Sequence, residues 1–169
     1  MSFQFRCATC DEVHHGIPTF GFALPAIAHQ IPESERATRV ALGTDDCVVD
    51  KERYLVRGCL EIPVRGYREP LNYGVWLSLS RDSFTRYKSS IEDVNRRSGA
   101  SYFGWLCTAI PGYPDTQLLK TSVHVRPWPT RPLVQLDATD HPLAIEQRDG
   151  VNPWRVQQIV ERIMHPRHR

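Results

Sequence analysis

The first residues with the types and spacing for chemistry are Cys7 and Cys10, a Cys-x-x-Cys motif that His14 follows after three intervening residues. Two thiolates at this spacing can occupy two corners of a tetrahedral zinc site. Since the chain contains no second Cys-x-x-Cys, the remaining ligands are expected among four side chains: His14, His15, Cys47 and Cys59. We predict a structural zinc site with the ligands Cys7, Cys10, His14 and Cys47.

Two other roles for the same thiols stay open. A redox pair is favoured where the motif begins a helix, because the helix dipole lowers the thiol pKa. Here Asp11, Glu12 and a stretch with Gly and Pro follow, and acidic neighbours oppose thiolate formation. Unmetallated thiols are the other alternative, and Cys59 and Cys107 are interpreted as such because they fall in predicted strands. Disulfides are not expected, since the N-terminus lacks the pattern of an export signal.

A second group of titratable residues surrounds Pro142 and consists of Asp140, His141 and Glu146. Such groups near the start of a helix could serve as acid–base groups or ligands, because the N-terminal amides favour anions. Capping explains the same residue types without chemistry, with Asp140, His141 or Thr139 as the N-cap before Pro142 and Glu146 in solvent. We favour the capping interpretation and keep a hydrolase-like site that uses His141 with Asp140 or Glu146 as the alternative.

A third group lies on two predicted neighbouring strands and contains Arg57, Glu61 and Trp76. If Arg57 and Glu61 lie beside Trp76 on an exposed face, they form a polar patch with an aromatic anchor, which is typical of a ligand surface. The alternative is a cross-strand ion pair with Trp76 in the core. The ligand-binding candidates are therefore Arg57, Glu61, Trp76, Asp140, His141 and Glu146.

The composition restricts the function classes. The 169 residues are 41% hydrophobic and carry a formal net charge of only +2, which excludes intrinsic disorder. Basic residues, mostly arginine, are interspersed with acidic ones, and the dense basic patches are limited to Arg96-Arg97 and the tail 165–169, so nucleic acid is not the expected partner. No apolar stretch approaches the length of a membrane span, and we expect a cytoplasmic protein. The common nucleotide-binding and hydrolase motifs do not occur.

These groups must be positioned by a mixed set of elements. Residues 1–35 are a loop-rich knuckle segment, because Gly and Pro punctuate them too densely for a long helix or strand. Residues 36–169 are predicted to form the body of one domain, so that a single domain spans 1–169. Helices are predicted over 33–42, 82–97, 140–147 and 152–164, and strands over 47–49, 54–64, 73–80, 102–110, 117–126 and 132–136. The order predicts an α+β fold with a mainly antiparallel sheet that carries helices on one face.

An ordered series of motifs runs through nearly the whole chain. It begins with Cys7-x-x-Cys10 and His14 and continues with DCVVD at 46–50, RGCLEIP at 57–63, YGVWLSLS at 73–80, YFGWL at 102–106, YPDT at 113–116 and TDHPLAIEQ at 139–147. In this series the chain resembles the bacterial domain-of-unknown-function family 2199. That family tends to place Gly after the second knuckle cysteine, where this chain has Asp11. The resemblance implies a bacterial cytosolic domain. It supplies no activity that could be expected of this chain.

The expected function is therefore a non-enzymatic, zinc-knuckled domain that binds a protein partner or a small ligand. A cleft that gathers His141, Glu61, Arg57 and Trp76 would favour the enzyme alternative instead.

Overall fold

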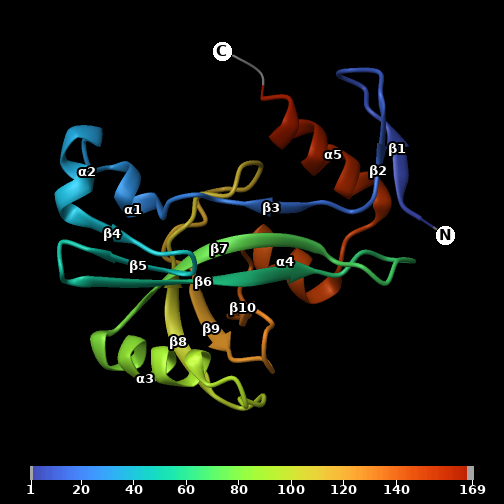
Figure 1. Cartoon of the computed structure of the whole chain (residues 1–169). Helices are drawn as coiled ribbons and strands as arrows, with labels where there is room; N and C mark the ends of the chain where they lie inside the picture. The colour runs from blue at the N-terminus through green and yellow to red at the C-terminus, as the bar shows by residue number, and fades with distance from the viewer. Residues whose placement is uncertain (1, 167–169) are drawn as a thin grey trace.

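A five-stranded barrel forms the centre of the structure, a computed structural model that describes residues 2–166 (Figure 1). Its strands are β6 (Arg53–Ile62), β7 (Leu71–Leu79), β8 (Ser101–Leu106), β9 (Lys120–His124) and β10 (Leu133–Leu136). Each strand pairs antiparallel with the next one. The last strand, β10, lies parallel to β6 and closes the sheet on itself.

The two longest strands, β6 and β7, each pair with two partners along one edge. The first half of β6 pairs with β5 (Asp46–Val49), and β4 (Val40–Leu42) continues the sheet beyond β5. The first half of β7 pairs with β3 (Thr19–Gly21) in parallel orientation. The barrel therefore continues into an open sheet at its edges.

Alternation along the strands fills the barrel as the sequence predicts. Val56, Leu60 and Ile62 of β6 are fully buried, and Val75 and Leu77 face them from β7. A second buried cluster lies on the other side of β6 and β7, under the short helix α1 (Ala26–His29); its members are Ala28, Ile31, Cys47, Val49, Leu55 and Trp76.

Two of the predicted helices end earlier than expected. The helix α2 covers Glu33–Arg39, because the chain from Val40 onward pairs with β5. The helix α3 covers Arg81–Glu92, with the Ser80 side chain accepting a hydrogen bond from the Ser83 amide. Val94, which lies within the predicted helix range 82–97, falls beyond the end of α3 and is 60% exposed.

The residue that enters the interior after α3 is Arg96. Its guanidinium donates to the backbone carbonyls of Ile91, Arg126 and Thr130, so these loop carbonyls obtain partners. The predicted basic pair Arg96-Arg97 is therefore not a free basic patch. Residues 167–169 of the predicted basic tail lie outside the described residues.

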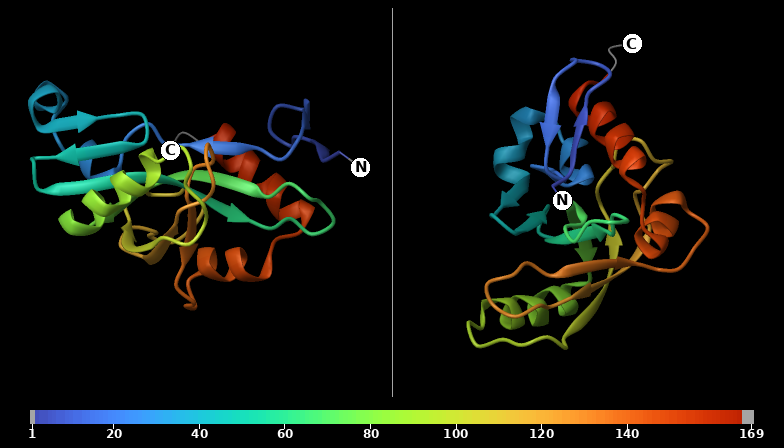
Figure 2. Two further views of the ribbon diagram at one scale, coloured as in Figure 1. Left: turned by 60° about the horizontal axis from the view of Figure 1, so that its bottom comes forward. Right: turned by 90° about the vertical axis from the view of Figure 1, so that its right-hand side faces the viewer.

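The N-terminal and C-terminal segments lie side by side. A small hairpin of β1 (Gln4–Arg6) and β2 (Val13–His15) packs beside α5 (Pro153–Met164) (Figure 2). The remaining helix, α4 (Pro142–Asp149), lies against β6 and β10. None of the described helices is long and apolar enough to cross a membrane.

The predicted fold class, α+β with a mainly antiparallel sheet and an N-terminal Cys-x-x-Cys segment, is confirmed. The closure of the sheet is an additional finding. It depends on one parallel contact between β10 and β6, for which the sequence pattern gives no signal.

Candidate metal centre

The Cys-x-x-Cys motif forms the turn of the β1–β2 hairpin. The Cys7 amide donates to the Glu12 carbonyl at 2.8 Å, and the Asp11 amide donates to the Cys7 carbonyl at 3.0 Å. Asp11 has a φ of 59°, the left-handed conformation that favours glycine and that aspartate tolerates better than most residues. This geometry explains why a glycine suits this position and how Asp11 replaces it.

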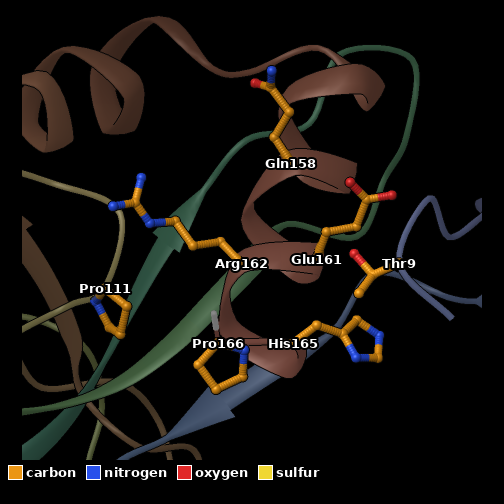
Figure 3. Close-up of a pocket in the computed structure, with 7 residues that line it drawn as sticks. All are labelled: Thr9, Pro111, Gln158, Glu161, Arg162, His165 and Pro166. Atoms are coloured by element: carbon orange, nitrogen blue, oxygen red, sulfur yellow. The ribbon is translucent and has the colours of Figure 1, made fainter. Parts of the chain in front are cut away.

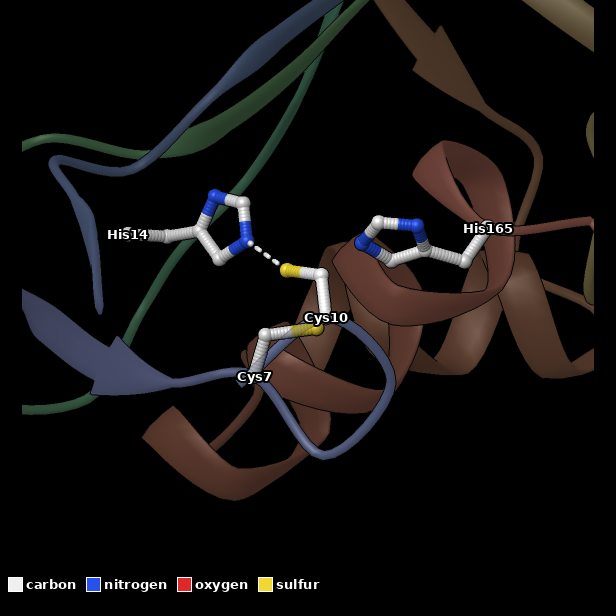
Figure 4. A group of neighbouring side chains, drawn as sticks. All are labelled: Cys7, Cys10, His14 and His165. Carbon is white, nitrogen blue, oxygen red and sulfur yellow. Dashed lines mark hydrogen bonds between the residues drawn. The ribbon is translucent and has the colours of Figure 1, made fainter. Parts of the chain in front are cut away.

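Four side chains converge at this turn: Cys7, Cys10, His14 and His165. Their ligand atoms all lie within 4.8 Å of one another, and Cys10 Sγ is 3.4 Å from His14 Nε2 (Figure 4). In a tetrahedral zinc site, bond lengths of about 2.3 Å to sulfur and about 2.0 Å to nitrogen place ligand atoms roughly 3.3–3.8 Å apart. The cluster needs only small side-chain movements to reach that geometry.

The helix α5 brings His165 to the hairpin. Asn152 caps the helix by accepting from the Arg155 amide, and Val156, Ile159 and Val160 bury its apolar face in the core. Near its end, Glu161 accepts a hydrogen bond from the Ala8 amide at 2.7 Å. These contacts fix the position of α5 along its axis relative to the Cys-x-x-Cys turn, so His165 lies opposite the two thiols.

His14 is held from the other side. Its ring stacks on Phe5 with the ring centroids 5.3 Å apart, and its centroid is 6.2 Å from that of His165. Figure 4 shows the two imidazoles on either side of the thiol groups. The ring of His14 is therefore held by Phe5 independently of any ligand.

An unpartnered atom marks the centre of the cluster. The Nε2 atom of His165 is buried and has no hydrogen-bond partner among residues 2–166, although buried polar atoms are nearly always paired. This nitrogen is the ligand atom that the ring turns toward Cys10 (Figure 4). A metal ion bound between the four side chains would satisfy it.

The backbone of the knuckle also changes the acidity of the thiols. Burial raises the pKa of Cys7, but hydrogen bonds from the backbone N–H groups of Cys10 and Thr9 lower it by more. The pKa of Cys7 therefore lies below its ordinary value. The Glu12 amide lowers the pKa of Cys10, whereas burial and the neighbouring Cys7 raise it, with a net increase. Because thiolate is the ligating form, the turn favours Cys7 as a ligand.

The donor set fits zinc. Two thiolates and two neutral imidazoles are borderline-soft ligands, and their charge balances that of one divalent ion. The four protein ligands would occupy every corner of a tetrahedron. Such closed sites are structural, because a catalytic zinc keeps one position for water or substrate.

The structure changes the predicted ligand set. Cys47 does not join the cluster; it lies on β5, fully buried beside Leu55 and Trp76, where burial raises its pKa to about 11. Cys59 lies on β6, and His15 follows His14 on the opposite face of β2. His165 completes the group, and no motif spacing connects it with the knuckle because it comes from the last described helix.

A cavity of about 620 Å³ adjoins the cluster (Figure 3). It is lined by Thr9, Pro111, Gln158, Glu161, Arg162, His165 and Pro166. The cavity and the cluster share His165, and Thr9, which lies between the two cysteines in the sequence, also lines the cavity.

The group around Pro142 is a helix cap. The Leu143 amide donates to His141 Nδ1 at 3.1 Å, and His141 Nε2 lies 3.2 Å from the Asp115 carbonyl oxygen. Of the three predicted cap candidates, His141 is thus the N-cap of α4, and Asp140 and Thr139 are not. The Thr139 hydroxyl accepts from the His141 amide instead.

Glu146, expected in solvent, binds two side chains. It accepts from the Tyr113 hydroxyl and from Arg155 Nε, the latter at 2.7 Å. Among the described residues, neither Asp140 nor His141 makes a hydrogen bond or ion pair with Glu146. The three residues thus form no common acid–base group.

The group of Arg57, Glu61 and Trp76 is divided between two places. Trp76 is fully buried, and its indole N–H and Arg57 both donate to the Phe22 carbonyl. Arg57 lies over the indole at 4.5 Å from the ring centroid. Glu61 instead pairs with Arg126 at 2.8 Å. The core position predicted for Trp76 in the second interpretation is correct, but the exposed aromatic patch does not form.

Comparison with known proteins gives a family and nothing more specific. No curated protein and no solved structure matches the chain. A family model matches residues 6–151, a range that includes Cys7, Cys10 and His14 but ends before α5 and His165. The chain therefore belongs to DUF2199, a family described as an uncharacterized protein conserved in bacteria.

Proposed function

We propose that Cys7, Cys10, His14 and His165 bind one zinc ion, which joins the N-terminal hairpin to α5 in a non-enzymatic binding domain of the bacterial cytosol. The observation that carries this proposal is the convergence of four ligand atoms within 4.8 Å around the unpartnered Nε2 of His165. The partner of such a domain is a protein segment or a small ligand.

Two features support a structural role for the metal. All four positions of a tetrahedral zinc would be filled by side chains. The same two elements are already joined by the hydrogen bonds from the Ala8 amide to Glu161 and from Gln157 to the Arg6 carbonyl. The metal would reinforce an existing contact between chain segments that are distant in the sequence.

The alternative enzyme would use His141 with Asp140 or Glu146. The contacts of these residues favour the binding domain, because His141 is engaged in capping and Glu146 is engaged by Tyr113 and Arg155. A general base needs a free position facing its substrate.

Metal analysis tests the proposal. Protein purified without added zinc is expected to contain close to one equivalent, and His165→Ala should lose most of it, because three ligands hold zinc far more weakly than four. The matched control is His15→Ala, which removes an imidazole from the opposite face of the same strand and should retain the metal. Substitution with Co²⁺ should give the intense visible bands of a tetrahedral site.

Less than about a tenth of an equivalent of zinc in the wild-type protein would overturn the proposal. Equal metal contents in His165→Ala and the wild type would instead remove His165 from the ligand set.

A further inference from the structure

The barrel has an interrupted seam between β6 and β10. The two strands share a single register pair, Leu133 with Cys59, and the Cys59 amide donates to the Pro132 carbonyl at 2.8 Å. A regular parallel pairing would continue with Glu61 opposite Gln135. That pairing is not made, although both strands extend past this point.

On β10, a side chain from α4 occupies the hydrogen-bonding groups that Glu61 of β6 would otherwise pair with. Gln147 Nε2 donates to the Val134 carbonyl at 2.7 Å, and the Leu136 amide donates to Gln147 Oε1 at 2.8 Å. These are the two hydrogen bonds that Glu61 would make with β10 in a parallel ladder. The carboxamide from α4 thus imitates one peptide unit of a neighbouring strand.

The peptide groups of Glu61 itself point into the seam. The preceding odd-numbered residues Arg57 and Cys59 direct their amides away from β7, to Asp45 and Pro132. Asn72 of β7 lies opposite Glu61 but directs its own amide to the Pro18 carbonyl. Glu61 and Asn72 are therefore a non-hydrogen-bonded pair of the β6–β7 ladder. Within residues 2–166, neither the strand registers of β6 nor the other backbone hydrogen bonds give the N–H or C=O of Glu61 a partner.

The chain that follows β6 is again paired, directly after its last residue, Ile62. The Val151 amide donates to the Pro63 carbonyl, and the Arg65 amide donates to the Val151 carbonyl, each at 2.8 Å. The gap is therefore one residue long. It offers one donor and one acceptor with the spacing of a β-strand residue.

A groove of about 650 Å³ opens at this gap, a size typical of ligand sites. Its walls are largely apolar and come from three elements: the β6–β7 connection with Val64 and Tyr67, β10 with Leu133 and Leu136, and the region of α4 with Ala138 and Ala144. Arg68 and Arg148 also line the groove. The free peptide groups of Glu61 thus lie beside an apolar surface that can receive side chains.

We propose that this groove binds a short extended peptide segment of a partner protein, one residue of which pairs through its N–H and C=O with the backbone of Glu61. An extended peptide supplies a donor and an acceptor at this spacing together with apolar side chains for the walls. The inference rests on the proposed role as a binding domain, but the zinc cluster and the groove share no residues.

Hydrogen exchange in the free protein tests the first premise. The Glu61 amide is expected to exchange at least about tenfold faster than the amides of Leu60 and Ile62, because these face β7 and are paired. Equal protection of the three amides would show that Glu61 already has a partner, and the inference would fail.

Peptide binding tests the second premise. A displayed library of random twelve-residue peptides is selected on the full chain, and the recovered peptides are measured on Ala138→Trp, which fills the groove, and on Ala37→Trp, a matched change on the exposed surface of α2. Binding should fall at least about tenfold in Ala138→Trp and stay unchanged in Ala37→Trp.

N-methylation of the peptide distinguishes backbone pairing from recognition of side chains alone. Methylation of one particular peptide nitrogen should weaken binding at least about tenfold, because it removes the donor to the Glu61 carbonyl. An even profile, equal binding to both tryptophan variants, or the absence of any selected peptide would each overturn the inference. Since His165→Ala tests the zinc without changing the groove, loss of metal with retained peptide binding would separate the two proposals.

Discussion

The hydroxyl of Tyr73 lies inside the barrel, where no solvent reaches it. The side chain is fully buried, and burial raises its pKa from the ordinary value of 10 to about 12. Burial also raises the pKa of Tyr113, which donates to Glu146. Folding therefore holds these phenols in the neutral form.

This shift predicts a loss of stability at high pH. Because the pKa of Tyr73 is higher in the folded chain, the free energy of unfolding is unaffected below pH 10 and decreases as the pH rises from 10 to 12, by about 2 kcal/mol. Tyr73→Phe should reduce this alkaline loss in urea titrations, whereas Tyr54→Phe, which removes a hydroxyl at a hairpin turn, should leave it unchanged. An unchanged alkaline profile in Tyr73→Phe would contradict the assignment.

At the same scale, the sequence identifies three of the four cluster residues. Cys7, Cys10 and His14 lie within one hairpin, so their proximity follows from local spacing. His165 arrives through the packing of α5, which depends on the whole core. Cys47 has the right donor atom, but alternation along β5 directs it into an apolar cluster. Residue type alone could not distinguish the two.

The helix α4 performs two tasks with its polar residues. His141 caps its first turn, and Gln147 pairs with the open edge of β10 near its other end. The buried residues Leu143 and Ala144 fix it between these two contacts. The helix therefore lies along the seam of the barrel and forms one wall of the groove there.

The cap gives a direct comparison between adjacent residues. His141→Ala should lower the free energy of unfolding by about 1 kcal/mol, because the Leu143 amide loses its acceptor. Asp140→Ala should change it by less than about 0.5 kcal/mol, since Asp140 is exposed. Thermal or urea denaturation of both variants measures the difference. The opposite order would restore Asp140 as the cap.

The type of each long element follows from the sequence, whereas the C-terminal ends of α2 and α3 do not. Alternation gives β6 and β7 and their inward faces correctly, and apolar spacing gives α5 almost to the residue. The end of α3 depends on Arg96, which is drawn to loop carbonyls distant in the sequence. The end of α2 depends on pairing with β5. Tertiary contacts of this kind leave no periodic signal.

Across the whole molecule, the barrel core and the zinc clasp stabilise different regions. The zinc clasp is the proposed metal site that joins β1 and β2 to α5. The barrel strands share one apolar core, whereas the hairpin of β1 and β2 is a separate two-stranded sheet. Small hairpins of this kind are marginal alone. The hairpin therefore depends on its contacts with α5 and, through Phe3 and Phe5, with the core, and the proposed metal would add to these contacts.

Removal of the metal should loosen this region selectively. With a chelator, the amides of residues 4–15 and the last turn of α5 are expected to exchange at least about tenfold faster, while β6 and β7 keep their protection. Hydrogen exchange with and without the chelator measures this. A uniform increase across the barrel would show that the metal supports the entire fold, and no increase anywhere would contradict the clasp.

The joining of the hairpin to α5 also orders events during synthesis. The knuckle residues leave the ribosome first, but the hairpin can close on its fourth ligand only after β10, α4 and α5 have been made. Until then, two thiols and one imidazole would form an incomplete site, from which zinc bound as proposed would dissociate readily. Tight zinc retention by a nascent chain would therefore report that the barrel has already assembled.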